Sequence, residues 1–286
     1  MTIANTFLLL LFILSIAKAV AFKTCSDRMD ARTTPLIISA WSLLAAVVTI
    51  PVFGHLWGNA QHIFMQSPSL LFLCLAKGGI LYIWCITSQK LVSLSLSSRI
   101  YMKPMATGLI AGSNYFLGER LSRAEWISAL ALFALSALFF FKGHISDVDR
   151  KARVYFVSLV GMSVVLSGMD HVLVSHVNWY ALLIVSNVML LGIGLCIHHK
   201  NIPLLKSAYC NKLALAAGCT YAVAEHVKFY QMVTINPVTT IAVLESLVSP
   251  VLMVLSAALW KERTVREQLS WGMAVFVFVA VPVVLR

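Results

Sequence analysis

The chain has 286 residues, of which 60% are hydrophobic and 12% are charged, and its mean hydropathy is +0.87. A water-soluble domain carries about 25% charged residues, so this chain has too little polar surface to cover a soluble globule. The composition therefore predicts a protein embedded in a lipid bilayer. The formal net charge of +11 is no argument for a nucleic-acid partner, because membrane proteins concentrate lysine and arginine in loops on one side of the bilayer.

Ten apolar segments can be separated at polar breaks, and each is close to the roughly 20 residues that an α-helix needs to cross the hydrocarbon core. Spanning β-strands would alternate polar and apolar residues, and these segments do not. We therefore expect an all-α membrane protein with ten transmembrane helices, the first being a true span and not a cleaved signal. The segments are residues 3–22, 34–53, 68–88, 91–117, 122–141, 154–174, 177–197, 207–231, 236–260 and 267–285.

Two polar corners repeat along the chain. Residues 118–123 (Gly-Glu-Arg-Leu-Ser-Arg) and residues 261–266 (Lys-Glu-Arg-Thr-Val-Arg) both spell Glu-Arg-x-x-Arg, with an offset of 143, half of the chain length. The longest connections are predicted at residues 54–67 and 142–153, and the second is the natural joint between halves 1–143 and 144–286. Because each half holds five spans, an odd number, the second half must insert upside-down relative to the first.

The orientation can be argued from the lysine and arginine residues of the loops. The loops after the even-numbered spans, together with the C-terminus, carry only three basic residues, Arg120, Arg123 and Arg286, whereas the loops after the odd-numbered spans carry fourteen. By the positive-inside rule, the more basic loops are cytoplasmic, which predicts that both termini lie outside. The loops after spans one, three, five, seven and nine hold fourteen basic residues: Lys23, Arg28, Arg32, Lys90, Lys142, Arg150, Lys151, Arg153, Lys200, Lys206, Lys212, Lys261, Arg263 and Arg266.

With these motifs, the sequence resembles the drug/metabolite transporter superfamily in its ten-helix EamA-type branch. The resemblance rests on residues 117–122 followed by Trp126, and on residues 260–263 followed by Trp271 and Gly272. It implies two inverted five-helix repeats, a central cavity reached from one side at a time, and no covalent chemistry, so not an enzyme. Lys261 stands where the family often has glycine, and members usually have cytoplasmic termini, against the loop charges here.

Prolines fall at similar places in the fourth and ninth segments, at Pro104 and Pro250. Each removes a backbone hydrogen bond and is expected to bend its helix. In inverted-repeat transporters such interrupted helices frame the substrate site. The alternative is a packing irregularity with no role in binding.

Five basic residues fall within the predicted spans: Lys18, Lys77, Arg99, Lys103 and Lys228. Charged side chains at membrane depth are costly and usually face a cavity or a partner. Arg99 and Lys103 are four residues apart and share a helix face that Asn114 continues. These two cations repel each other unless an anion or a carboxylate lies between them, which favours an anionic substrate. The alternative is that both side chains extend to the interface.

The other intramembrane charges suggest further contacts. Lys77 lies too deep to reach the interface easily and shares a polar stripe with Trp84, whereas we expect Lys18 to be interfacial. Glu225 and Lys228 can pair on one helix face, with Tyr221 one turn before. Glu225 and Glu245 are candidates for proton coupling or for structural ion pairs, and both interpretations stay open. We expect Asp170 at the rim of its helix.

Metal and catalytic motifs are weak. Cys196, His198 and His199 cluster at a helix end without a second pair of ligands, and the usual hydrolase, metalloprotease and phosphate-loop patterns do not occur in the sequence. We therefore expect no metal and no cofactor. Gly108 and Gly112 form a G-x-x-x-G pattern that favours close packing within the chain over a dimer contact.

These observations predict a multi-pass carrier of the cell membrane, monomeric or homodimeric, that moves a small anionic or zwitterionic metabolite by alternating access. An amino acid, an organic acid and a phosphorylated compound all fit, and protons are one candidate for the coupling ion. An exporter of lipophilic cations fits less well, because its cavity should hold few cations. A membrane-embedded enzyme acting on a lipid-linked substrate needs polar groups gathered at one interface. In this sequence the polar groups fall at depth and in both halves, which favours the carrier over the enzyme. The residues expected to bind substrate are Lys77, Trp84, Arg99, Lys103, Asn114, Tyr221 and Lys228.

Overall fold

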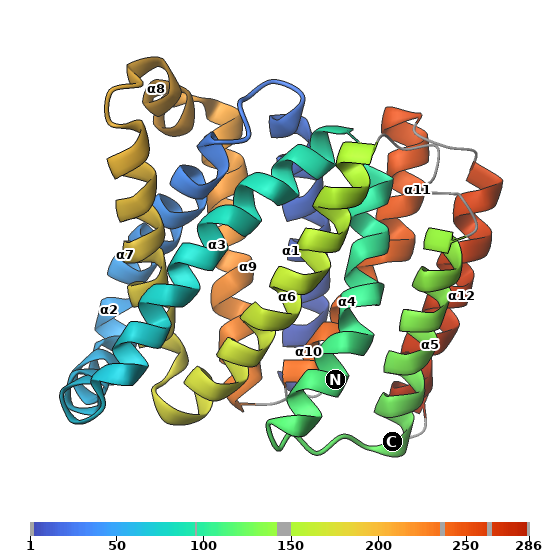
Figure 1. The fold of residues 1–286 in the computed structure, drawn as a ribbon, viewed down its shortest axis with the longest axis horizontal. Helices are drawn as coiled ribbons and strands as arrows, with labels where there is room; N and C mark the ends of the chain where they lie inside the picture. The colour runs from blue at the N-terminus through green and yellow to red at the C-terminus, as the bar shows by residue number, and fades with distance from the viewer. Residues whose placement is uncertain (1–2, 95, 142–149, 235–237, 262–264, 285–286) are drawn as a thin grey trace. The chain divides into compact units, whose positions relative to one another are not determined.

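The protein is all-helical, as its sequence predicts. The computed structural model describes residues 3–94, 96–141, 150–234, 238–261 and 265–284, and these residues form twelve α-helices and no strand (Figure 1). Among the described residues, six stretches are long and apolar enough to cross a membrane, as expected of a membrane-embedded protein. These are Leu9–Ser26, Thr33–Gln66, Pro68–Leu94, Lys151–His176, Trp179–His198 and Ile241–Trp260.

The chain divides into two compact units. Unit 1 comprises Met1–Gln89 and Met169–Asn236, and unit 2 comprises Lys90–Gly168 and Pro237–Arg286. Each unit therefore combines segments from both halves of the sequence. The expected inverted repeat of residues 1–143 and 144–286 stays a prediction, and most of its joint, residues 142–149, lies outside the described residues.

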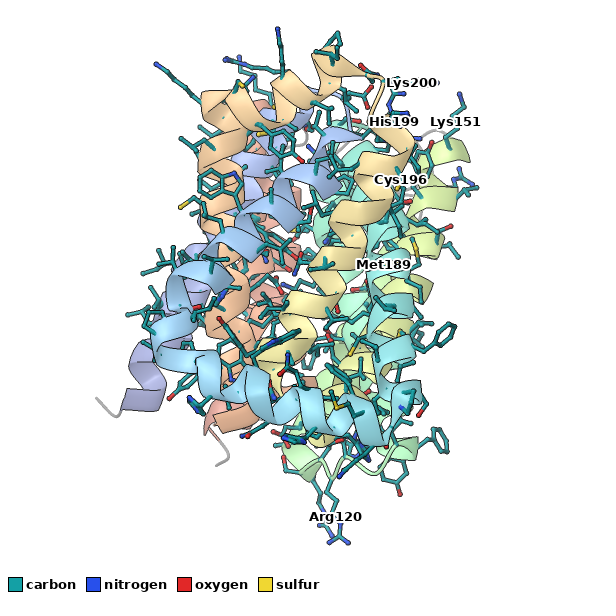
Figure 2. All side chains as sticks on the ribbon, turned by 90° about the vertical axis from the view of Figure 1, so that its left-hand side faces the viewer. Arg120, Lys151, Met189, Cys196, His199 and Lys200 are labelled. Atoms are coloured by element: carbon teal, nitrogen blue, oxygen red, sulfur yellow. The ribbon has the colours of Figure 1, made fainter. Side chains whose placement is uncertain are left out.

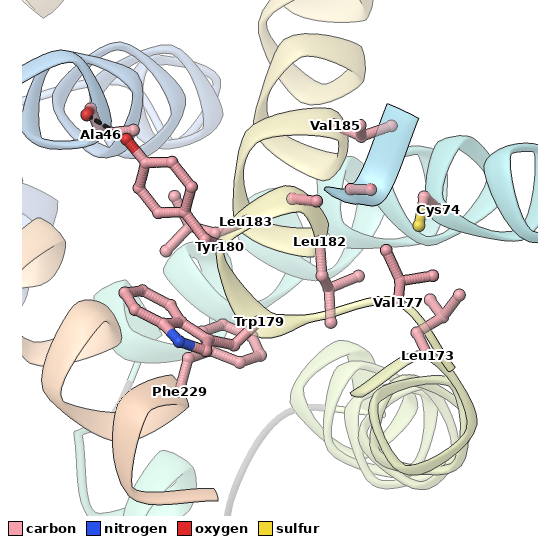
Figure 3. Close-up of a cluster of buried hydrophobic side chains, with 12 residues drawn as sticks. Ala46, Cys74, Leu173, Val177, Trp179, Tyr180, Leu182, Leu183, Val185 and Phe229 are labelled. Carbon is pink, nitrogen blue, oxygen red and sulfur yellow. Dashed lines mark hydrogen bonds between the residues drawn. The ribbon is translucent and has the colours of Figure 1, made fainter. Parts of the chain in front are cut away.

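Unit 1 is built around helix α9. Helix α1 packs along α9, and α2 packs on both α7 and α9. Trp179 and Tyr180 centre a hydrophobic cluster in which the Tyr180 hydroxyl donates to the Ala46 carbonyl at 2.6 Å (Figure 3). The helices of this unit are α1 (Ile3–Ser26), α2 (Thr33–Gln66), most of α3 (Pro68–Leu94), the end of α6 (Arg150–His176), α7 (Trp179–His198), α8 (Ile202–Cys210) and α9 (Lys212–Thr234).

The expected connection at residues 54–67 is wrong, because α2 continues as one helix of 34 residues to Gln66. At 1.5 Å per residue it is about 51 Å long, well beyond the ~30 Å hydrocarbon core. Pro51 lies inside it and cannot donate to the carbonyl four residues earlier, and the helix bends along its length (Figures 1 and 2). The glycines at 54 and 58 each cost only about 1 kcal/mol in a helix, so they weaken it without ending it.

Unit 2 contains α4 (Leu96–Phe116), α5 (Arg123–Phe141), α10 (Val238–Glu245), α11 (Val248–Trp260) and α12 (Val265–Val284). Helix α4 packs on α5, α10 and α11, and α5 packs on α12. A Cβ added at Gly108 would lie 2.4 Å from Phe133 Cβ and 2.8 Å from the Ala129 carbonyl oxygen. This glycine therefore serves close packing within the chain, as its spacing predicts.

The predicted span at residues 236–260 is interrupted between α10 and α11. Pro250 cannot donate to the Ser246 carbonyl, and its ring crowds that oxygen. The Ser246 carbonyl instead accepts a shorter-range bond from Ser249 N at 3.0 Å, and Glu245 is the last residue of α10. Pro104, by contrast, lies inside the continuous helix α4. The two prolines thus have different effects on the helices that carry them.

The first corner begins α5 with a capping box. The Ser122 N–H and hydroxyl both donate to Glu125 Oε2 at 2.8 Å, and Glu125 N donates back to the Ser122 hydroxyl at 3.3 Å. This reciprocal pair satisfies backbone donors that the first turn of a helix leaves open. Part of the second corner, residues 262–264, lies outside the described residues.

Candidate functional site

Three lysines of the apolar helices each pair with a carboxylate of another helix. The lysine comes from the first half of the sequence in every pair, and the carboxylate comes from the second half. Because a charge withdrawn from water is costly unless it is paired, these contacts explain how the cations are tolerated. The pairs are Lys18 with Glu225 at 3.2 Å, Lys77 with Asp170, and Lys103 with Glu245 at 3.0 Å.

In unit 1, the first group of polar and charged side chains lies on helix α9. Tyr221, Glu225 and Lys228 follow one another at helical spacing and share a face. Glu225 Oε1 contacts Lys18 Nζ of α1 at 3.2 Å, and Glu225 Oε2 lies 4.0 Å from Lys228 Nζ. The Lys18 ammonium also lies 5.2 Å from the centre of the Tyr221 ring, a distance typical of a cation–π contact. Glu225 is therefore held between cations from two helices.

The Lys77–Asp170 pair lies beside the same helix. The Lys77 side chain is 6% exposed and that of Asp170 is 10% exposed. Lys77 Nζ lies 4.8 Å from the centre of the Phe229 ring, and Lys228 Nζ lies 5.9 Å from it. One aromatic ring of α9 thus lies next to two ammonium groups. We call the resulting set the α9 cluster: Lys18, Lys77, Asp170, Tyr221, Glu225, Lys228 and Phe229.

The α9 cluster has a positive charge balance, with three lysines and two carboxylates. At ~4 Å in surroundings of intermediate polarity, two unit charges interact by about 4 kcal/mol. Such a set can accept a carboxylate or phosphate group at its lysines. Its carboxylates can in turn accept hydrogen bonds from an amine. The chemistry of the cluster therefore fits an anionic or zwitterionic ligand better than a cationic one.

The structure brings together four of the residues expected to form the site, Lys77, Tyr221, Glu225 and Lys228. Trp84 packs against the small hydrophobic cluster that contains Tyr221, so both expected aromatic residues lie in one region of unit 1.

Two residues of the cluster were not among those expected to form the site. Asp170 was expected at a helix rim, but the residue as a whole is only 7% exposed and it pairs with Lys77. Lys18 was expected at the membrane interface, which stays a prediction, and its side chain is 21% exposed and contacts Glu225. A lysine at membrane depth requires a carboxylate partner, and this requirement was the signal in the sequence that could have drawn attention to Asp170.

The remaining expected residues lie in unit 2. Lys103 of α4 contacts Glu245 at 3.0 Å, where α10 ends. The Thr107 and Ser246 hydroxyls are 3.1 Å apart one turn further along α4. Arg99, one turn before Lys103, is partly exposed. Asn114 is fully buried, but it lies eleven residues beyond Lys103, about 16 Å along the helix, and is separate from this pair.

Sequence reasoning did not single out Gln231, the most deeply buried amide of α9. Its side chain is 0% exposed, and among the described residues neither its oxygen nor its nitrogen has a hydrogen-bond partner. It lies three residues after Lys228, close to the face that carries the α9 cluster. A buried amide without a partner costs about 1–3 kcal/mol, so Gln231 is a polar group whose burial no contact among the described residues offsets.

The residues considered for a metal site do not assemble one. Within the described part of the chain, no three His, Cys, Asp or Glu side chains are grouped to hold an ion. His198 instead contacts the Tyr82 hydroxyl at 3.1 Å, and His199 contacts the Cys196 carbonyl at 2.9 Å.

No protein-family model and no curated protein matches the chain. Twenty-five chains of solved structures do match. One of them, described only as "Crystal structure of protein", is 12% identical, with a TM-score of 0.64, and the match covers 99% of this chain and 97% of that one. At this identity the match shows a shared fold and says nothing about function.

Proposed function

We propose that this chain is a secondary transporter that carries a small anionic or zwitterionic metabolite across the cell membrane by alternating access. The α9 cluster is the observation that supports this most, because charged side chains at membrane depth usually mark the path of a substrate or an ion. The proposal includes membership of the drug/metabolite transporter superfamily and two inverted five-helix repeats, as the sequence resemblance implies.

The chemistry of the cluster narrows the class of substrate. A carboxylate or phosphate of the substrate would contact Lys77 and Lys228, and an amine would contact Glu225. The rings of Tyr221 and Phe229 offer flat apolar surfaces beside these charges. Amino acids, organic acids and phosphorylated compounds fit this arrangement, whereas three lysines disfavour a lipophilic cation.

Protons are the coupling ion that best fits the two carboxylates Glu225 and Glu245. Each contacts a lysine that the substrate could engage instead, Lys18 or Lys228 for Glu225 and Lys103 for Glu245. Protonation of a carboxylate would release its lysine to the substrate, so proton binding and substrate binding would be linked. We propose this linkage separately for Glu225 in unit 1 and for Glu245 in unit 2.

A thermal-shift screen of the purified full chain tests the proposal. A ligand that binds only the folded state raises its stability by about 2.7 kcal/mol at a hundredfold excess over the dissociation constant. We expect stabilisation by carboxylated or phosphorylated metabolites, and loss of this shift in Lys228→Ala. Arg120→Ala, which changes an exposed cation at the α4–α5 corner, is the control and should keep it.

Transport itself is measured by uptake of the stabilising compound into vesicles that contain the purified protein. Uptake that requires the protein and is lost in Lys228→Ala would support the carrier. Stabilisation by hydrophobic cations alone, unchanged in Lys228→Ala, would contradict the anion-carrying site and favour a cation exporter.

A further inference from the structure

One end of unit 1 is strongly basic. The connection between α1 and α2 carries Arg28 and Arg32, and α8 with its flanks carries Lys200, Lys206 and Lys212. Both segments lie at the same end because α8 packs on α2 and the two share one hydrophobic cluster. That cluster joins residues from α2, α7, α8, α9 and the connection: Met29, Leu36, Ile37, Trp41, Leu191, Leu204, Leu205, Ala208 and Ala214.

The opposite ends of the helices of unit 1 contain no lysine or arginine. Residues 54–68, which comprise the last part of α2 and the start of α3, have none, and neither do residues 171–180, which comprise the end of α6 and the start of α7. The charge asymmetry is therefore a property of the ends of this unit and does not arise from its composition as a whole. An asymmetry of this kind is typical of a protein whose basic end faces the cytoplasmic leaflet.

Helix α8 lies where a spanning helix ends. Helix α7 ends at His198, and His199 and Lys200 lead directly into α8 (Figure 2). Leu204 and Ala208 anchor one face of α8 in the unit, at 6% and 1% exposure. Its outer face shows Ile202 at 61% and Tyr209 at 41% exposure beside the exposed Lys206. Exposed apolar and aromatic side chains between lysines are typical of a helix that lies in the membrane interface.

The lysines around α8 are not matched by acidic partners. Within the described part of the chain, Lys200, Lys206 and Lys212 are exposed and form no ion pair. The nearby acidic residues are engaged elsewhere, since Asp27 pairs with Lys23 at 3.3 Å and Asp30 pairs with Arg32. The hydrogen bond from Arg32 holds the pKa of the Asp30 carboxyl group below its usual range. The charges of α8 therefore call for an anion from outside the chain.

We propose that α8 and its flanking lysines form a binding surface for the headgroups of anionic phospholipids. Ile202 and Tyr209 enter the upper acyl region, and Lys200, Lys206 and Lys212 contact the phosphates above it. Basic segments beside spanning helices are attracted to anionic leaflets, and this attraction falls off within a Debye length. The proposal stands on unit 1 alone and does not depend on transport.

The test compares the full chain in nanodiscs of phosphatidylcholine with nanodiscs that also contain phosphatidylglycerol. We expect a higher melting temperature with the anionic lipid, and a smaller difference as salt is added. The double variant Lys200→Gln/Lys206→Gln should lose this difference. The double variant Arg120→Gln/Arg123→Gln removes the same charge at the exposed α4–α5 corner and should keep it.

A charge-preserving variant separates binding from folding. Lys200→Arg/Lys206→Arg should retain the lipid-dependent shift, because the guanidinium group also binds phosphate. The proposal is overturned if the unaltered protein shows no lipid-dependent shift, or if the glutamine variant of α8 retains it in full. It is also overturned if the corner variant loses the shift equally, since the attraction would then belong to the net charge.

Discussion

Gly118 and Lys261 lie 143 residues apart, and both have a positive backbone φ, +95° and 54°. No other residue in the described part of the chain has a positive φ. Gly118 follows the end of α4, and Lys261 ends α11, each at the start of a Glu-Arg-x-x-Arg corner. Each corner therefore begins with a residue of positive φ. Helices commonly end in this way, usually with glycine at the left-handed position.

This relationship predicts that Lys261→Gly stabilises the protein. A side chain in the left-handed region costs roughly 1–2 kcal/mol, so we expect a gain of about 1 kcal/mol after the entropy of the freer unfolded chain is subtracted. The measurement is the melting temperature in detergent. Lys261→Ala removes the same charge but keeps the Cβ, and an equal gain in that variant would show that charge, and not backbone conformation, is responsible.

The Lys77–Asp170 pair predicts a strongly coupled double-mutant cycle. Lys77→Met leaves the Asp170 carboxylate buried without its partner, and we expect a loss of about 3–5 kcal/mol. Lys77→Met/Asp170→Leu removes both charges and should recover most of the loss. Thermal unfolding of the two single variants and the double variant gives the coupling energy. Additive losses would mean that the pair does not exist in the folded protein.

Gln231→Met should stabilise the ligand-free protein. The substitution removes a buried amide that has no partner among the described residues and keeps a similar volume, so we expect a gain of about 1 kcal/mol. Gln89→Met is the matched control, because the Gln89 amide donates to the Phe22 carbonyl at 2.9 Å and its loss should destabilise. If Gln231→Met is as destabilising as this control, the Gln231 amide has a partner in solution. A weaker ligand-induced shift in Gln231→Met would add this amide to the substrate site.

The sequence also predicts a substrate contact at Arg99 and Lys103 of unit 2, which is tested separately from the α9 cluster: Arg99→Ala and Lys103→Ala are then expected to abolish substrate binding while the protein still folds. Lys103 contacts Glu245 across α4 and α10, and Arg99 lies one turn earlier on α4, so an anionic group near Glu245 would meet both cations. The readout is the ligand-induced thermal shift, with the melting temperature of each unliganded variant as the test of folding. Unchanged affinity in both variants would remove these residues from the site.

The close approach of α4 to α5 predicts that Gly108→Ala destabilises the protein. The new Cβ would lie 2.4 Å from Phe133 Cβ, and overpacking of this kind costs about 1–3 kcal/mol. Gly112→Ala, one turn away on the same helix, is the control because no atom lies within 4 Å of its added Cβ. Equal melting temperatures for the two variants would contradict the packing.

Local information in the chain was sufficient to predict the helical class and the membrane-type composition. A helix closes its hydrogen bonds within one segment, and about 20 apolar residues in a row are recognisable without knowledge of their neighbours. The same reasoning drew attention to Lys77 and Lys228, because a charge in an apolar segment is conspicuous wherever the segment packs. The extent of α2 beyond residue 53 was missed, since isolated glycines and polar residues resemble a loop although the helix tolerates them.

Only the tertiary structure decided which charges meet. Lys18 and Glu225 are 207 residues apart, and Lys77 and Asp170 are 93 residues apart. Whether such residues touch depends on which helices are neighbours and on how each is rotated about its axis, and both follow from side-chain packing between distant segments. Asp170 was therefore assigned to a rim, and Gln231 was not noticed at all. A sequence shows which side chains carry a charge or an amide, but packing determines whether a partner lies within reach.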